Sequence, residues 1–308
     1  MAQIFAHLDG CDDARESLPP DYWDLLRDSH HERIEEGHWH SAGQGDVYAD
    51  AMINLQDELV QWTIDLYYNQ TQGGANLQLR PTNDDGDDLP IFLHYDEKLL
   101  SRWRMLFYAM AGSGHWKSFE VKSIEMPQIL LHEFAQAMKQ SENYFSADAA
   151  YSVSFDNNRF DQESALYLSK VVDQCIYMSS FAVTNNAIDS LSTAAQLSTS
   201  IAKHNHLEQI DLSDSGLGES ARVLSAVLSS CANLEQLCLN NVNMQARDIR
   251  SRGITIISDF VASNPLLQKL ELDLNQLGDD AALLLAKALG TNAKLLDLSL
   301  ADNNFSEV

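Results

Sequence analysis

The stretch that decides the fold is residues 267–280, Leu-Gln-Lys-Leu-Glu-Leu-Asp-Leu-Asn-Gln-Leu-Gly-Asp-Asp. It reads as an apolar residue, two variable residues, an apolar-x-apolar pair, two more residues, an asparagine and a further apolar residue. The alternation Leu270-Glu-Leu272 is typical of a short strand with one buried face. The acidic Gly278-Asp-Asp predicts a helix start, and residues 281–289 form an apolar stretch that Gly290 ends.

Seven copies of this pattern run from about residue 116 to the end of the chain. They begin at Trp116, Ala150, Met178, Leu207, Leu234, Leu267 and Leu295. Their strand pairs are Phe119/Val121, Val153/Phe155, Phe181/Val183, Ile210/Leu212, Leu237/Leu239, Leu270/Leu272 and Leu298/Leu300. The asparagine position holds Asn158, Asn186, Asn275 and Asn303, with Ile124, Ser215 and Val242 in the other copies. The apolar position after it is filled by Met126, Phe160, Ile188, Leu217, Met244, Leu277 and Phe305.

Each position of the pattern has a physical role. The apolar pair points inward from a parallel strand, and the residue between the pair points outward. The turn after the strand buries backbone groups that need partners, and an asparagine amide both donates and accepts hydrogen bonds. Stacked copies therefore predict a ladder of asparagine side chains. The helix of each copy needs its neighbours to bury its apolar stripe.

These residues resemble the leucine-rich repeats of ribonuclease inhibitor and of the Ran GTPase-activating protein. Residues 267–280 lie nearest to the consensus of the long repeat form, and the resemblance covers roughly residues 98–308. It implies an α/β solenoid shaped like a horseshoe, with parallel strands on the concave face and helices outside. It implies fold more firmly than function, because the repeat serves many roles.

The first third of the chain departs from the pattern. Asp46–Tyr68 is predicted to be a helix, Leu77-Gln-Leu79 a degenerate first strand, and Lys98–Met110 a second helix. We therefore expect residues 76–115 to form an irregular first repeat of a repeat domain at 76–308, and residues 1–75 to be a mainly helical extension or cap. The seventh copy stops at Val308 before its helix, which predicts an incomplete or imperfectly closed array.

Composition limits the classes of partner. Hydrophobic residues make up 45% of the chain, which excludes a mainly disordered protein, and the formal net charge is -25. This charge argues against binding to nucleic acid or an anionic membrane and is compatible with a basic protein partner. No signal peptide or membrane span is evident, and the four cysteines include no CxxC pair. We expect a cytoplasmic monomer, with Cys231 and Cys238 as small buried thiols.

Motifs for catalysis or metal binding are weak. His30, His31, Glu35, His38 and His40 crowd around Trp39 but do not match HExxH, so a solvated loop is preferred to a metal site. No phosphate-binding glycine loop and no GxSxG is evident. We therefore expect no cofactor, no metal and no catalytic residue.

The outward residues of the copies predict a binding surface in three columns. The first outward column is Glu120, Ser154, Ala182, Asp211, Cys238, Glu271 and Ser299. The second is Lys122, Asp156, Thr184, Ser213, Asn240, Asp273 and Ala301. The third is Ser123, Asn157, Asn185, Asp214, Asn241, Leu274 and Asp302. Acids gather at Asp211, Asp214, Glu271 and Asp273, which favours a cationic partner, although solvated polar residues would give the same pattern.

An insertion in the fifth copy adds a basic patch, Arg247, Arg250 and Arg252, which is either a second contact for a partner or a solvated start to the helix predicted at residues 254–261. The main hypothesis is a non-enzymatic scaffold that binds a protein through the acidic strand face, with Asn240 among the contacts. One alternative, from the resemblance alone, is a GTPase activator in which one of these arginines touches the nucleotide-bearing partner. Another is a sensor fragment of a larger intracellular receptor.

Overall fold

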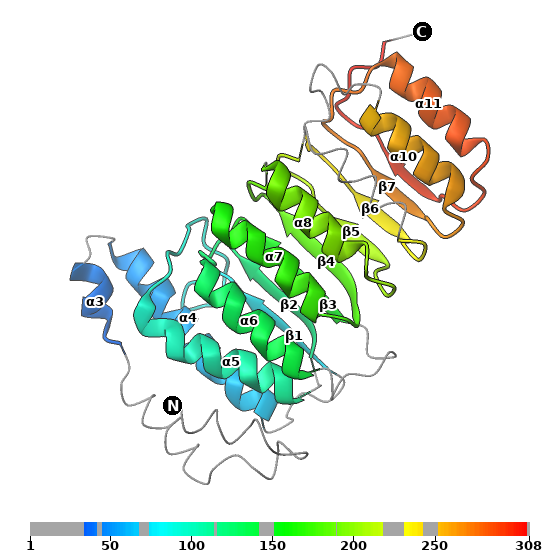
Figure 1. The fold of residues 1–308 in the computed structure, drawn as a ribbon. Coiled ribbons are helices and arrows are strands. Elements are labelled where there is room, and N and C mark those ends of the chain that lie inside the picture. The colour runs from blue at the N-terminus through cyan, green and yellow to red at the C-terminus, as the bar shows by residue number, and fades with distance from the viewer. Residues whose placement is uncertain are drawn as a thin grey trace.

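The computed structural model describes residues 34–41, 45–67, 74–113, 116–141, 151–188, 190–217, 231–242 and 252–306. These residues form one parallel sheet of eight strands in the order β1 to β8, so strands adjacent in sequence are adjacent in space. The strands are β1 Ala75–Leu79, β2 Trp116–Lys122, β3 Tyr151–Asp156, β4 Met178–Thr184, β5 Gln209–Asp211, β6 Gln236–Cys238, β7 Lys269–Glu271 and β8 Asp297–Ser299. Figure 1 shows this sheet with its layer of helices.

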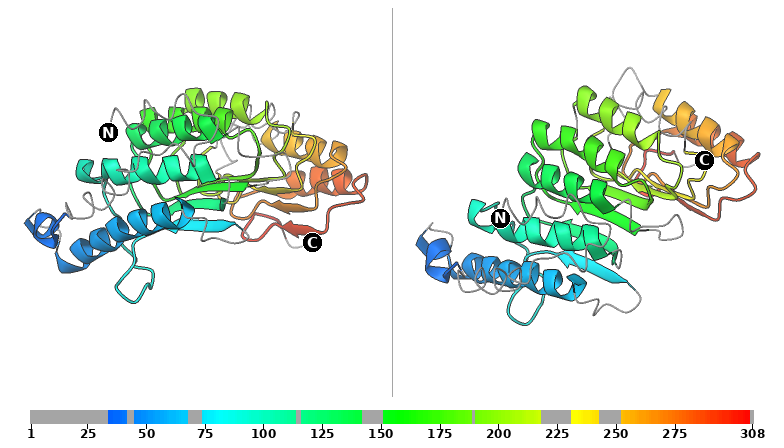
Figure 2. Two further views of the ribbon diagram at one scale, coloured as in Figure 1. Left: turned by 90° about the horizontal axis from the view of Figure 1, so that it is seen from below. Right: turned by 60° about the horizontal axis from the view of Figure 1, so that its bottom comes forward.

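The helices alternate with the strands and follow the same order. They are α3 Glu36–Ser41, α4 Asp46–Tyr67, α5 Leu100–Ser113, α6 Gln128–Ser141, α7 Gln162–Gln174, α8 Leu191–Ile201, α10 Arg252–Ser263 and α11 Asp279–Leu289, with a 3-10 turn, η1, at Glu97–Leu99. The views in Figure 2 place the helices of the repeats on one side of the sheet and leave the strands along the other side. The arrangement is a repeating parallel β/α unit, as the sequence pattern predicted.

The strand register confirms the seven predicted copies. Phe119 lies opposite Val153, and the same column continues through Phe181, Ile210 and Leu237 to the last strands. The predicted degenerate strand is also confirmed, because Leu77 pairs with Phe119 in the same register.

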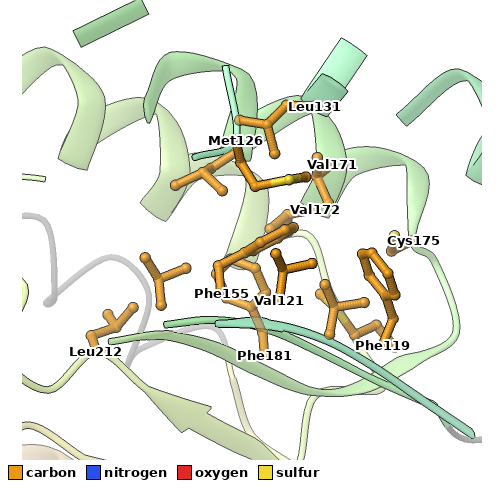
Figure 3. Close-up of a cluster of buried hydrophobic side chains, with 14 of the residues drawn as sticks. Phe119, Val121, Met126, Leu131, Phe155, Val171, Val172, Cys175, Phe181 and Leu212 are labelled. Atoms are coloured by element: carbon orange, nitrogen blue, oxygen red, sulfur yellow. The ribbon is translucent and has the colours of Figure 1, made fainter. Parts of the chain in front are cut away.

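Side chains from this column and its neighbours form one continuous core between sheet and helices. Phe119 stacks on Phe134 of α6 with ring centroids 5.0 Å apart, and Phe155 meets Phe134 edge-on at 6.3 Å. Figure 3 shows Phe119, Phe155 and Phe181 pointing from the strands toward the helix layer. Burial of each such side chain contributes roughly 1.5–3 kcal/mol, so the strand column is a main source of stability.

The predicted asparagine side chains are bonded at the turns after β3, β4, β7 and β8. Asn186 is buried, and its Nδ2 donates to the carbonyl of Phe155 in the preceding repeat at 3.0 Å. Its Oδ1 accepts the backbone N–H of Asn158 at 2.8 Å. Asn275 and Asn303 make equivalent bonds to the repeats before them. Each amide thus satisfies buried backbone groups that the sharp turn leaves without partners.

A second column, largely buried, lies at the opposite turn, from helix to strand, and the sequence reasoning missed it. It comprises the residue three positions before the first apolar residue of a copy: Cys175, His204, Cys231 and Asn264 are buried, and Asn292 is half-buried. Asn292 Nδ2 donates to the carbonyl of Val261 at 2.7 Å. His204 Nε2 bonds to the carbonyl of Val172 at 2.8 Å. The position varies among His, Cys and Asn because each type reaches a carbonyl of the preceding repeat.

The N-terminal helices are close to their predicted positions. α4 matches the predicted helix at residues 46–68, whereas the helix predicted from Lys98 begins as the 3-10 turn and continues as α5. α4 packs beside α5 and so adds one more helix to the layer (Figure 1).

The prediction of a solvated loop at the histidine cluster is wrong for residues 36–41, which form α3. His38 Nε2 pairs with Asp96 Oδ2 at 2.8 Å, and Trp39 donates to the same oxygen at 2.9 Å. Apolar packing of Trp39 and these long-range polar bonds hold the segment as a helix. His30 and His31 lie outside the described residues.

Candidate partner-binding surface

We call the side of the sheet on which no helix of the described residues lies the open face (Figure 2). It consists of the three outward columns and the residues of β1 that continue them. Strand alternation places one side chain in the core and the next on this face, as the buried-exposed-buried pattern of β1 illustrates. Most residues of the first two columns are half-buried or exposed.

The third outward column is the turn itself. All seven of its residues have a left-handed backbone, with φ between 47° at Asn241 and 57° at Leu274. Asn and Asp tolerate this conformation better than other residues with a side chain, which accounts for their frequency in the column. The column therefore presents short polar side chains along the edge where the strands end.

Asp211 and Asp214 carry charge that no described cation offsets. Asp211 is half-buried, and one carboxylate oxygen accepts the backbone N–H of Ser213 at 2.9 Å. Asp214 is exposed and accepts a bond from Asn241 Nδ2 at 2.7 Å. Both donors are neutral, so the two carboxylates keep their negative charge on the open face.

Glu271 is different, because Lys269 lies beside it. The Lys269 ammonium is 2.6 Å from Glu271 Oε1, and Asn240 Nδ2 donates to Glu271 Oε2 at 2.8 Å. The bond from Lys269 is the largest cause that holds the pKa of Glu271 below its ordinary value. The Glu271 charge is thus largely compensated within the chain, and Asn240 is engaged with it.

Asp273 is engaged in the turn of the next repeat. It accepts the Ser299 hydroxyl at 2.6 Å and the backbone N–H of Ala301 at 2.7 Å. Its own N–H donates to Asn240 Oδ1 at 2.8 Å. Of the four predicted acids, Glu271 is paired with Lys269, and Asp273 is held by the next repeat, whereas Asp211 and Asp214 have one neutral hydrogen-bond donor each among the described residues.

Cys238 lies on the open face between Asp211 and Glu271 in the strand register. The prediction that Cys238 is buried is wrong, since it is half-buried, whereas Cys231 is buried as expected. Burial, followed by the charges of Asp211 and Glu271, raises the pKa of the Cys238 thiol to about 12. The group is a neutral thiol at physiological pH and a poor nucleophile.

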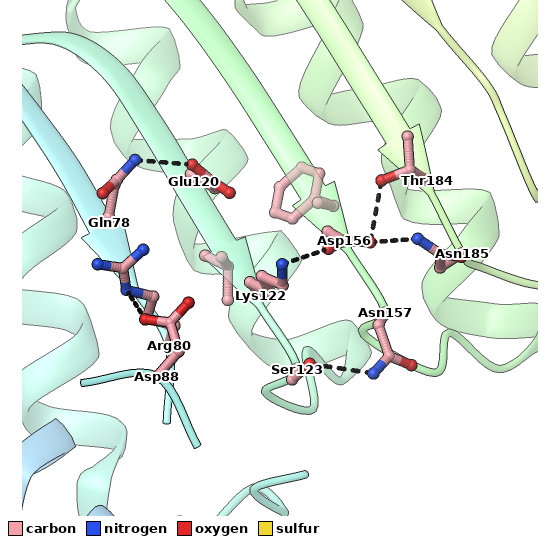
Figure 4. A network of polar contacts seen from close by, with 12 residues as sticks. Gln78, Arg80, Asp88, Glu120, Lys122, Ser123, Asp156, Asn157, Thr184 and Asn185 are labelled. Carbon is pink, nitrogen blue, oxygen red and sulfur yellow. Dashed lines mark hydrogen bonds and ion pairs between the residues drawn. The ribbon is translucent and has the colours of Figure 1, made fainter. Parts of the chain in front are cut away.

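Two cations, Arg80 and Lys122, lie at the ends of β1 and β2, at the N-terminal side of the acidic part of the open face. Arg80 Nε donates to Asp88 at 2.8 Å, and the Lys122 ammonium is 3.5 Å from Asp156 (Figure 4). Asp156 is also bound by neutral donors, Thr184 Oγ1 at 3.0 Å and Asn185 Nδ2 at 2.7 Å. Arg80 was missed although it continues the alternation of Leu77-Gln-Leu79.

Several predicted features stay untested. Arg247 and Arg250 lie outside the described residues. Arg252 is the first residue of α10. Within the part of the chain that the structure describes, no three potential ligands among His, Cys, Asp and Glu are grouped to hold a metal ion, and no helix has the length and apolar character to cross a membrane.

No model of a known protein family matches the chain, and no curated protein matches it significantly in sequence.

Proposed function

We propose that this chain is a leucine-rich-repeat protein of the ribonuclease-inhibitor-like type whose open face, the concave side of a horseshoe, binds a protein partner without catalysis. The observation that carries the proposal is the pair Asp211 and Asp214, two carboxylates on a helix-free face with no described counter-ion. The partner presents a cationic surface to them, because charge complementarity steers encounter and fixes orientation. In this proposal residues 76–308 form the repeat domain, and α4 belongs to an N-terminal cap at residues 1–75.

The bonding within the open face supports a rigid binding surface. Side chains of adjacent repeats are bonded to each other along the columns, as Asn241 is to Asp214 and Asn240 is to Glu271. Side chains fixed before binding lose less conformational entropy when a partner docks. A face built in this way favours recognition of a folded surface of matching charge.

The test is affinity capture of partners from native cell extract by the full chain and by Asp211→Asn/Asp214→Asn. The control is Asp259→Asn/Asp280→Asn, which removes the same charge from two exposed positions on α10 and α11. We expect the first variant to lose most of the captured basic protein and the control to retain it. Equal capture by both variants would place the interaction away from Asp211 and Asp214.

A further inference from the structure

A cavity of about 260 Å³ lies on the open face where β1 and β2 end. Its lining combines the cations Arg80 and Lys122 with one acid, Asp88, and with Ser123 and the apolar residues Pro81, Leu89 and Pro90. We propose that this cavity is a subsite for a carboxylate, the Asp or Glu side chain of an extended segment on the protein partner. This inference rests on the proposed function and names a second recognition point on the same face.

The guanidinium of Arg80 supplies the first half of the subsite. Its Nε is engaged by Asp88 at 2.8 Å, whereas its two terminal amino groups make no hydrogen bond recorded among the described residues. Figure 4 shows these two nitrogens directed away from Asp88. Two parallel N–H donors on one edge of a guanidinium match the two oxygens of a carboxylate. Asp88 thus orients the guanidinium through Nε and leaves the fork of its two terminal amino groups for a ligand.

Lys122 supplies the second half. Its side chain is 46% exposed, and its ammonium reaches Asp156 only at 3.5 Å, which is long for a charged hydrogen bond. Asp156 keeps its bonds from Thr184 and Asn185, both at Oδ1, when Lys122 leaves Oδ2 and turns toward a ligand. A long ion pair with a solvent-exposed lysine contributes little to stability, so its loss is easily offset.

A half-buried acid near Arg80, Glu58 of α4, does not cancel the charge of Arg80 fully. Burial raises the pKa of Glu58 on α4 to about 7, although the charge of Arg80 acts in the opposite direction. Glu58 is therefore partly protonated at neutral pH. The cavity keeps two cations against Asp88 and this partial charge.

The walls are held in place before any ligand binds. Leu89 N–H donates to the carbonyl of Pro81 at 2.9 Å, and Asn83 Oδ1 caps the turn by accepting the N–H of Asp87 at 2.8 Å. Farther along, Leu93 pairs with the turn after β2, its N–H donating to the Ser123 carbonyl at 2.9 Å. A rigid wall beside Arg80 excludes water from one side of the fork and favours an acidic residue that has an apolar neighbour.

The position of the subsite defines the charge pattern of the partner. Arg80 follows β1, and Asp211 ends β5, so four strand steps separate them, which corresponds to roughly 19 Å at a strand spacing of about 4.8 Å. A partner that reaches both Arg80 and Asp211 therefore carries an acidic and a basic residue about 19 Å apart. Such opposite charges set one orientation of the partner along the open face.

The test is direct titration of the full chain, uniformly labelled with ¹⁵N, with the peptide acetyl-Ala-Leu-Glu-Leu-Ala-amide; the affinity of Arg80→Lys is read from the backbone signals around Ser123. We expect the Arg80 Nε signal to shift with saturation, and affinity to fall about tenfold in Arg80→Lys, which keeps the charge but removes the fork. Lys122→Gln, read from backbone signals around Ser123, should weaken binding too. Lys269→Gln is the matched control and should bind normally, because its charge is paired with Glu271 in another repeat.

Three outcomes would overturn the subsite. They are equal shifts with acetyl-Ala-Leu-Gln-Leu-Ala-amide, in which the carboxylate is replaced by an amide, unchanged affinity in both Arg80→Lys and Lys122→Gln, or stronger binding of inorganic phosphate than of the Glu peptide. Peptide binding does not depend on the free acids, so Asp211→Asn/Asp214→Asn should bind the peptide normally. Failure of the subsite is thereby distinguished from failure of the proposed function, which is read from capture of the native partner.

Discussion

Leu274 is the residue that least suits its backbone conformation. It has φ of 57° in the third outward column, where three of the aligned positions hold Asn, and its side chain is 47% exposed. A left-handed conformation costs an ordinary L-residue about 1–2 kcal/mol, and Asn offsets part of that cost. The repeat geometry fixes this turn. Leu274 therefore bears more backbone strain than the asparagines at the aligned positions of other repeats.

We expect Leu274→Asn to raise the free energy of unfolding by about 1 kcal/mol, measured by urea denaturation. The control is Leu266→Asn, a second exposed leucine that lacks the positive φ. If both substitutions change stability equally, side-chain polarity rather than backbone strain accounts for the effect.

His204 predicts a pH dependence of stability. It is buried, Nε2 is bonded to the Val172 carbonyl, and Nδ1 has no hydrogen-bond partner. Burial lowers the pKa of His204 below the ordinary 6.5, with the bond to Val172 opposing the shift. The unfolded chain therefore takes up a proton before the folded chain does. The contribution of neutral His204 to stability is complete above about pH 6.5 and is lost as the pH falls through the pKa of His204 in the folded chain.

We expect this loss, followed by urea unfolding between pH 8 and pH 5, to be smaller in His204→Asn. Asparagine stands at the equivalent position in two later repeats, Asn264 and Asn292, and makes the carbonyl contact without titrating. An identical pH profile in wild type and variant would assign the acid sensitivity to other groups.

At the scale of elements, the short strands depend on the turns that end them. β5 to β8 have three residues each, so the backbone bonds of the turn and the asparagine ladder carry much of the pairing between repeats. Asn275 links three copies, because Nδ2 donates to Leu239 in the copy before and its N–H donates to Asn303 in the copy after. Helices and strands of this kind are stable only as neighbours.

Asn275→Ala is expected to lower the free energy of unfolding by about 1–3 kcal/mol, since it leaves the Leu239 carbonyl and the Val242 N–H buried without a partner. Thermal or urea unfolding measures the change. Asn205→Ala, at an exposed position, serves as the control and should be nearly neutral. A loss of less than about 0.5 kcal/mol, which is roughly the error of such measurements, would mean that water replaces the amide.

At the scale of the whole molecule, charge on the open face is set by pairings between side chains. Lys269 compensates Glu271, so the face is less acidic than its sequence column. We expect Lys269→Gln to speed association with a basic partner and to steepen its salt dependence, because Glu271 would then be uncompensated. Stopped-flow or surface-based kinetics at two salt concentrations measure this. A slower association would show that the partner contacts Lys269 itself.

The repeat period by itself determined the strand column from Phe119 to Leu298, the asparagine ladder at Asn186 and Asn275, and the strand at Leu77, because each is a local pattern repeated in phase. Tertiary structure decided which charges are free. The pairs Arg80–Asp88, Lys122–Asp156 and His38–Asp96 depend on how far side chains reach across neighbouring elements, which spacing along the chain does not specify. It also decided that His204 and Cys231 serve the same turn, because what the position requires is contact with a carbonyl of the preceding repeat rather than one residue type.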